Sequence, residues 1–447
     1  MFEAKKMKIN KFILKQIFDI KTYGIRELFR KLYLLIKIMA RIPINIIAIV
    51  PCVIIRLIRP WIIIRIERLD CTTFSALAHD PVVYYCKKKL KIDLATTKHI
   101  DLVYIHDKGE IYNKQLVIMW KRKLNFLPSC LLDPINRVNK LIPGWKVHTI
   151  EEISFRKIGR ESGNLIDKCQ PLDFTIEEEI YGKKMLSKFG LKDDDKFVCL
   201  AVRDSAYQLK KIPARFRDWS YHDYRNWDID KFILAAEELA KKGYYVFRMG
   251  VVVEKPFNSN NPKIIDYANS NLRNDFLDVY LGAKCSFCIA TGLGFDALAT
   301  IFKRPLVLLI SPLGGMGINN ENTLLLFRHH ILKKENRRLS LSEIFAHGVA
   351  YAMVTKIFEE KGIKLVDNTP EEIRDSVIEM AENLEFKRQL SSKDEELQKT
   401  FKSLFILNTK RFGYHKEVPE PYRRYYRDQM RCSHSTKFLK NNRDWLR

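Results

Sequence analysis

Four short apolar runs in the second half of the chain constrain its fold more than any other feature. They occupy residues 197–202, 244–249, 285–290 and 306–310, with a shorter run at 264–267. Each is almost continuously apolar instead of alternating with polar residues, which indicates strands buried on both faces. Helical patterns separate them, at residues 230–242, 275–282 and 295–302. This alternation predicts an α/β fold whose parallel sheet is covered by helices.

Residues 61–190 repeat the alternation in a weaker form. Strands are predicted at residues 61–66 and 101–105, and helices at residues 75–89, 113–123 and 177–189. Prolines interrupt residues 124–176, where no element is predicted. We therefore expect two Rossmann-like parallel-sheet domains that face a cleft, at residues 61–190 and 196–365, and then C-terminal helices with a basic tail at residues 366–447.

The net charge of +25 lies mainly at the two ends of the chain. Residues 1–66 carry 14 basic and 3 acidic side chains, and residues 410–447 carry 11 basic and 4 acidic ones. The hydrophobic content of 47% is enough for a core, which excludes a disordered polyelectrolyte. A charge excess of this size indicates an anionic partner, such as nucleic acid, anionic lipid or a phosphorylated substrate.

The N-terminal segment combines positive charge with apolar residues. Between residues 25 and 39 the apolar residues recur at helical spacing, and Arg26, Arg30 and Lys37 lie on another face. Residues 42–55 are uncharged, but these 14 residues fall short of the roughly 18 that cross a bilayer. We expect residues 1–60, and chiefly residues 20–60, to form a basic amphipathic segment on a membrane surface. The alternative is a helix packed on the protein's own core.

The nine cysteines are scattered and no signal peptide is evident, so we expect a cytoplasmic protein with reduced thiols. Cys285 and Cys288 form a lone C-x-x-C pair inside one apolar run. A zinc site needs a second pair at suitable spacing, and the sequence holds none. We interpret the pair as part of a buried strand, and we predict neither a metal nor a cofactor.

Polar residues follow the predicted strands, and ligands of open α/β sheets bind beyond the carboxyl ends of the strands. An arginine there suits a bidentate contact with a phosphate, and glycines let the backbone approach a ligand. The candidate ligand-binding residues are Arg203, Ser205, Tyr224, Arg225, Asn226, Asp228, Arg248, Gly250, Asp266, Thr291, Gly292, Gly294 and Asp296. The candidate catalytic residues are Asp204, His222 and His79.

These candidates also have structural alternatives. Arg203 can form a salt bridge across its loop, and His222 can be a structural histidine. Arg248 lies inside an apolar run and needs a partner, which is either Asp266 or a phosphate of a ligand. The loop of residues 290–296 lacks the spacing of a dinucleotide fingerprint, so its glycines serve either a phosphate or tight packing.

The order of these motifs resembles a bacterial glycosyltransferase family of surface-carbohydrate biosynthesis. The resemblance covers about residues 50–410 and rests on residues 113–116, 119–122, 202–205, 222–229, 243–250, 265–268, 278 and 369–372. More distantly, the chain is similar to GT-B-type transferases, including fucosyltransferases. The family has a Gly-His element after its first strand, whereas residues 71–79 of this chain keep His79 without a glycine. The catalytic base and the handling of the acceptor therefore stay open.

The resemblance implies a nucleotide-diphosphate-sugar donor bound mainly by residues 200–310, with Arg203 on the diphosphate and no metal in the site. Residues 61–190 would then contact the acceptor, a polyprenyl-linked or cell-surface glycan. We expect such an enzyme to be peripheral on the cytoplasmic membrane and to bind no nucleic acid. Two alternatives stay open: a basic nucleic-acid-binding protein, and a non-catalytic protein of a carbohydrate pathway.

Overall fold

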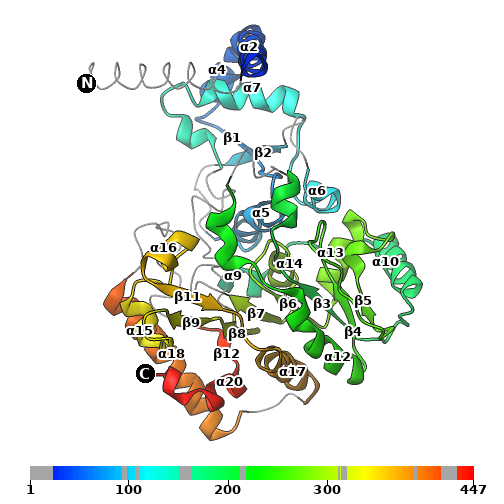
Figure 1. Ribbon diagram of the computed structural model, residues 1–447. Coiled ribbons are helices and arrows are strands. Elements are labelled where there is room, and N and C mark those ends of the chain that lie inside the picture. The colour runs from blue at the N-terminus through cyan, green and yellow to red at the C-terminus, as the bar shows by residue number, and fades with distance from the viewer. Residues whose placement is uncertain are drawn as a thin grey trace. The chain divides into compact units, whose positions relative to one another are not determined.

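The four apolar runs form the middle of a seven-stranded sheet in the computed structural model of the chain (Figure 1). The structure describes residues 24–92, 98–105, 111–150, 163–211, 218–310, 313, 320–386, 390–413 and 430–447. The chain forms two units, the first from residues 1–68, 95–107 and 126–150, and the second from residues 69–94, 108–125 and 151–447. Each unit contains parallel strands, which confirms the predicted α/β class.

All seven strands of the large sheet, which belongs to the second unit, run parallel in the order β12-β8-β7-β6-β3-β4-β5. Their bounds are β3 Phe197–Ala201, β4 Tyr245–Arg248, β5 Ile264–Ile265, β6 Phe287–Ala290, β7 Leu306–Ile310, β8 Thr323–Phe327 and β12 Ser433–His434. Every residue of β3, β6, β7 and β8 is buried, which explains their continuous apolar sequences. The strand order reverses between β3 and β6, and such a switch point leaves a crevice at the carboxyl ends of the strands.

Helices cover both faces of this sheet. Helices α12 (Ile233–Lys241) and α17 (Pro370–Phe386) lie on one face, and α13 (Asp275–Lys284) and α14 (Asp296–Ile301) lie on the other (Figure 1). The other α-helices of the second unit are α5 Phe74–Lys89, α6 Lys114–Lys121, α9 Gly163–Lys168, α10 Ile176–Lys188, α11 Ala206–Lys211, α15 Leu341–Ala346, α16 Thr355–Glu360, α18 Ser392–Phe412 and α20 Thr436–Asn441. Its 3₁₀ helices are η3 Ser220–Arg225, η4 Ile229–Phe232, η5 Tyr267–Asn269 and η6 Arg443–Trp445.

A small antiparallel sheet follows β8 in the second unit. Strand β9 (His329–Leu332) pairs with β10 (Arg337–Arg338) on one side and β11 (Ile363–Val366) on the other. Further along the chain, residues 430–447 add β12 to the edge of the large sheet and bury Cys432, Phe438, Leu439 and Trp445. This part of the predicted basic tail therefore belongs to the folded core.

The first unit carries the N-terminal helices. They are α2 (Ile25–Met39), α3 (Arg41–Ile47) and α4 (Ile49–Leu57), and they precede a parallel pair of strands, β1 (Ile63–Arg68) and β2 (His99–Tyr104). Helix α7 (Ser129–Asn139) and the 3₁₀ helix η1 (Trp145–His148) complete this unit. Pro43 and Pro51 are each the third residue of a helix, where a missing backbone N–H is tolerated. The prolines thus divide the uncharged segment into two short helices.

Large apolar side chains on α2, α3 and α4 remain exposed. They are Ile25, Leu28, Phe29, Leu32, Tyr33, Ile36, Met39, Ile42, Ile44, Ile46, Ile47, Ile49, Val50, Val53, Ile54 and Leu57, and Trp61 follows at 74% exposure. A smaller set, Ala48, Cys52 and Ile55, is buried. Within the described residues, no helix is both long enough and apolar enough to cross a bilayer.

Several elements differ from the sequence-based predictions. The proline-containing region 124–176 holds helix α7, whose residue Pro134 lies inside the helix. The strand predicted at residues 285–290 begins at Phe287, because Cys285 caps the carboxyl end of α13. Both cysteines of the C-x-x-C pair are buried, as predicted. Residues 61–190 contribute to both units, and the proposed domain boundaries stay a prediction.

Candidate functional site

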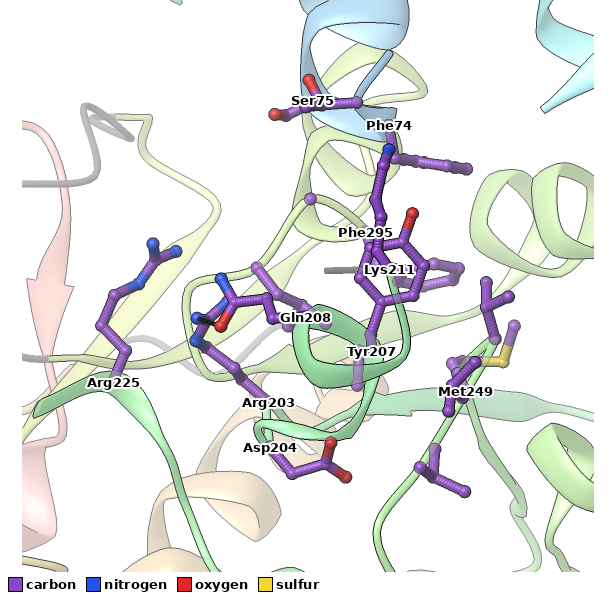
Figure 2. A pocket seen from close by; sticks show the side chains of 18 of the residues that line it. Phe74, Ser75, Arg203, Asp204, Tyr207, Gln208, Lys211, Arg225, Met249 and Phe295 are labelled. Atoms are coloured by element: carbon purple, nitrogen blue, oxygen red, sulfur yellow. Dashed lines mark hydrogen bonds between the residues drawn. The ribbon is translucent and has the colours of Figure 1, made fainter. Parts of the chain in front are cut away.

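A cavity of about 620 Å³ lies at the carboxyl ends of β3, β4 and β6, within the second unit (Figure 2). Its wall comes from the residues after these strands, from α11, from the start of α5 and from η3. The lining residues are Thr72, Thr73, Phe74, Ser75, Tyr112, Ala201, Val202, Arg203, Asp204, Tyr207, Gln208, Lys211, Trp219, Tyr221, His222, Arg225, Met249, Gly250, Val251, Val252, Val253, Asp278, Leu293, Gly294 and Phe295. The cavity therefore occupies the crevice that the sheet topology predicts.

Arg203 lies two residues beyond β3 and extends along the cavity (Figure 2). Its backbone N–H donates to Thr291 Oγ1 (2.8 Å), and its Nη2 donates to Gln208 Oε1 (2.7 Å). Its buried Nε has no hydrogen-bond partner within the described part of the chain. Burial, and then the neighbouring charge of Arg225, lower the pKa of the Arg203 guanidinium to about 10. The side chain stays cationic at neutral pH. The charge of Asp204 acts on it in the opposite, favourable direction, but no carboxylate in the described part of the chain forms an ion pair with it.

Arg225 is the second cation of the cavity and is the last residue of η3. Its Nη2 donates to the carbonyl oxygen of Gly292, and its Nε is buried without a hydrogen-bond partner among the described residues. No carboxylate of the described residues forms an ion pair with Arg203 or Arg225. Both arginines are half-buried. A partly desolvated charge without an ion-pair partner is unfavourable, so this pair of guanidinium groups is suited to an anionic ligand.

Aromatic rings surround the cationic end of the cavity. Trp219 stacks on Tyr221 and on His222, with distances between ring centroids of 6.2 Å and 6.5 Å. The ring centroids of Tyr221 and His222 lie 3.9 Å apart. His222 thus lines the cavity, as expected for a candidate catalytic residue, and it also packs within an aromatic cluster. Elsewhere in the wall, the ring centroids of Tyr112 and Tyr207 lie 5.4 Å apart.

The other candidate catalytic residues are engaged or lie elsewhere. Asp204 lines the cavity, but its Oδ1 accepts from the N–H of Ala206 (3.0 Å) and its Oδ2 accepts from the N–H of Glu254 (2.9 Å). These contacts fix the loop after β3, so the carboxylate has a structural task. His79 is buried in α5 and does not line the cavity, which α5 reaches through Phe74 and Ser75.

Arg248 pairs with Asp266, one of the two partners that its sequence position left open. Its Nη1 donates to Asp266 Oδ1 (3.1 Å), and its Nη2 donates to the carbonyl oxygen of Lys255 (3.2 Å). The remaining oxygen of Asp266 accepts from Phe257 N (3.0 Å) and Asn269 Nδ2 (2.7 Å). Neither Arg248 nor Asp266 lines the cavity, although Gly250 does.

The loop between β6 and α14 supports the cavity mainly through its backbone. Gly292 has a left-handed φ of +73°, which favours glycine, and its carbonyl oxygen accepts from Arg225. A Cβ on Gly294 would lie 3.3 Å from both Phe74 Cβ and Ser75 N, so this glycine permits close packing on the start of α5. Thr291 and Asp296 are buried and lie outside the lining.

The remaining predicted residues lie behind the cavity wall. Tyr224 is buried, and its N–H donates to Thr355 Oγ1 (3.2 Å). Asn226 donates to Asp223 Oδ1 (3.0 Å). Asp228 accepts from Lys255 Nζ (2.6 Å), a contact that lowers the pKa of its carboxyl. Ser205, just before α11, also lies outside the lining.

Sequence reasoning missed several lining residues. Tyr207 and Lys211 lie four and eight residues after Arg203, and both belong to α11. A spacing of four residues places two side chains on one face of a helix, so the sequence could have indicated that both line the cavity. Asp278 comes from α13, where its carboxylate accepts from Tyr267 Oη (3.0 Å) and Arg273 Nη2 (2.7 Å). Burial nevertheless raises the pKa of Asp278 to about 6.

No protein-family model and no curated protein matches the sequence. Among solved structures, the chain is similar to a glycosyl transferase family 9 protein of Veillonella parvula DSM 2008, with 13% identity, a TM-score of 0.41 and coverage of 73% of this chain and 98% of that one. It is also similar to ADP-heptose LPS heptosyltransferase II of E. coli, with 12% identity, a TM-score of 0.39 and coverage of 71% and 98%. The α/β class of this chain therefore rests on its own parallel strands.

Proposed function

We propose that the chain is a glycosyltransferase whose nucleotide-diphosphate-sugar donor binds in the cavity of the second unit. One observation carries the proposal: Arg203 and Arg225 bring two guanidinium groups to one cavity without a carboxylate partner among the described residues. A diphosphate supplies the missing negative charge and offers several oxygens for bidentate contacts. The position beyond the strand ends, at a switch point, is the usual place for such a ligand.

The chemistry follows from charge development during transfer. When the bond between the anomeric carbon and the diphosphate breaks, negative charge accumulates on the leaving phosphate oxygens. Arg203 and Arg225 would stabilise that charge as fixed cations that are in place before the reaction begins. We propose that these side chains take the place of a metal ion. His222 lines the same cavity and is our candidate for the group that accepts the proton of the acceptor hydroxyl.

The test measures binding and turnover of the intact chain. Calorimetry with UDP, GDP and ADP gives nucleotide affinity, and a panel of nucleotide sugars gives hydrolysis or transfer. Arg203→Met and Arg225→Met should each weaken nucleotide binding at least tenfold. Arg304→Met is the matched control, because Arg304 donates to the carbonyl oxygen of Ala283 (2.6 Å) and lies outside the cavity. Binding without turnover of any donor would favour a non-catalytic protein, and no binding at all would refute the proposal.

We further propose that the acceptor is a polyprenyl-linked or cell-surface glycan and that the enzyme works at the cytoplasmic membrane surface. The support is the first unit, where α2, α3 and α4 expose the apolar residues named above. Residues 28–66 contain seven basic and no acidic side chains. Helix α2 adds one further basic residue, Arg26, and one acidic residue, Glu27. An apolar surface with so large an excess of positive charge matches the interface of an anionic bilayer better than it matches a soluble protein.

Vesicle sedimentation tests this part separately. Replacing Val50 and Ile54 (61% and 49% exposed) by Gln should weaken binding to vesicles that contain phosphatidylglycerol about tenfold. The control pair is Ile176 and Ile180 on α10 (76% and 63% exposed), whose replacement by Gln should have no effect. Equal binding of neutral and anionic vesicles would contradict the role of the basic residues, and binding to nucleic acid instead would contradict the membrane.

A further inference from the structure

Arg328, between β8 and β9, holds the backbone on both sides of Arg225. Its side chain is buried, with 5% exposure. Its Nη1 donates to the carbonyl oxygen of Tyr224 (2.6 Å), and its Nη2 donates to the carbonyl oxygen of Asn226. The residues before and after Arg225 are thus bonded to a single planar group.

The same guanidinium also connects to Arg203. The central carbon of the Arg328 guanidinium lies 4.1 Å from the ring centroid of Trp227, which is a cation–π contact. The N–H of Trp227 donates to the carbonyl oxygen of Arg203 (2.9 Å). Arg328 therefore lies against residues 224–227, which carry Arg225 and reach the backbone of Arg203 through Trp227.

The small antiparallel sheet holds Arg328 in place. Asp367, directly after β11, forms an ion pair with Arg328 Nη2 (2.5 Å). From α16, Thr355 Oγ1 donates to the carbonyl oxygen of Ser220 (2.8 Å) and accepts from the N–H of Tyr224 (3.2 Å). Since η3 is only six residues long, these bonds from outside it define its path.

We propose that Arg328 is a positioning residue, which fixes Arg225 beside Arg203 so that both guanidinium groups bind one diphosphate. Arg328 does not line the cavity and would not touch the ligand. Without this brace, the repulsion between two half-buried cations would move Arg225 away from Arg203. The inference rests on the proposed function, because it presupposes a diphosphate at these two side chains.

Calorimetry with inorganic pyrophosphate tests the role in a double-mutant cycle. Arg328→Met should weaken pyrophosphate binding at least tenfold, and Arg304→Met should not. Arg328→Lys should fail to restore affinity, because one ammonium group cannot bond two carbonyl oxygens and Asp367 together. The double variant Arg225→Met/Arg328→Met should bind no more weakly than Arg225→Met alone, since the brace acts through Arg225.

Three results would overturn the positioning role: multiplicative losses in the double variant, full affinity in Arg328→Lys, or no more loss in Arg328→Met than in Arg304→Met. If Arg328→Met does not fold, Asp367→Asn replaces it, because it removes the counter-charge and keeps the guanidinium. We expect Asp367→Asn to weaken binding severalfold, and unchanged affinity would overturn the proposal. If the wild-type chain binds neither pyrophosphate nor UDP, GDP or ADP, the proposed function itself is refuted, and the positioning role with it. If it binds one of these nucleotides but not pyrophosphate, the same variants are measured with that nucleotide, and the same three results decide.

Discussion

Replacing Arg203 by Met should stabilise the ligand-free protein and remove its response to a diphosphate. Methionine keeps an unbranched stem but has no charge. In the folded chain the pKa of Arg203 falls to about 10 from an ordinary value of 12.5, chiefly through burial and then through Arg225. Because a tenfold change in an acid constant corresponds to about 1.4 kcal/mol, the buried charge opposes folding by about 3 kcal/mol.

The net gain from the substitution is smaller. The variant loses the hydrogen bond from Arg203 Nη2 to Gln208, which contributes about 1 kcal/mol. We therefore expect the free energy of unfolding to rise by about 2 kcal/mol, which is a gain of a few degrees in Tm for a domain of this size. Affinity for pyrophosphate should fall by about 2 kcal/mol or more, or about thirtyfold, because one charge-assisted contact is lost.

Thermal unfolding with and without pyrophosphate separates the two effects. Without the anion, Arg203→Met should melt above the wild type. With the anion, the wild type should gain stability by mass action while the variant should not. The difference between the two melting temperatures should therefore shrink or change sign. If the variant melts below the wild type without anion, and pyrophosphate raises both equally, then Arg203 is an ordinary structural arginine.

Three further outcomes follow from buried groups elsewhere in the second unit. Arg248→Met should lower the free energy of unfolding by about 3 kcal/mol in urea titrations, because it leaves the carboxylate of Asp266 without its ion-pair partner. This effect has the opposite sign to that of Arg203→Met. An unchanged free energy of unfolding would contradict the pairing. Burial lowers the pKa of His434 to about 3 and that of His330 to about 4. Their neutral folded forms lose stability as pH falls below the unfolded value near 6.5, by about 2 kcal/mol each between pH 7 and pH 5, so His434→Gln should show a shallower loss over that range. Gly182→Ala should cost about 1–3 kcal/mol by calorimetry, because its Cβ would overlap the ring of Tyr280, and an unchanged Tm would show that the ring moves freely.

The parallel sheet was predictable because its strands are local apolar runs. Leu306–Ile310 matches β7 at both ends, and the predictions for β3, β4 and β6 differ by one or two residues at an end. Strand β8 is also a mostly apolar run, but no strand was predicted there. Arg203, Arg225 and His222 were predictable for the same reason, since each follows β3 within one stretch of chain. The two-residue strands β10 and β12 have no pattern of their own, and pairing with β9 and β8 defines them.

Contacts between distant residues were outside the reach of sequence reasoning. Arg328 and Asp367 are 39 positions apart, and neither lies in a motif. Tyr112 reaches the cavity from a segment before α6, far from the strands that define the site. The hydrogen bonds that Asp204 accepts from the N–H groups of Ala206 and Glu254 depend on the folded loop, so the sequence did not show that this carboxylate is engaged by the backbone. Its catalytic role stays a prediction.

The position of β12 has a consequence for the synthesis of the chain. This strand pairs with β8 and comes from residues 433–434, more than 100 positions after β8, so the large sheet gains this edge only when those residues have been made. Until then, β8 presents unpaired backbone groups along a strand in which four of the five residues are apolar, a typical starting point for aggregation. A nascent chain, or one that loses residues 430–447, would therefore depend on a chaperone that shields this edge.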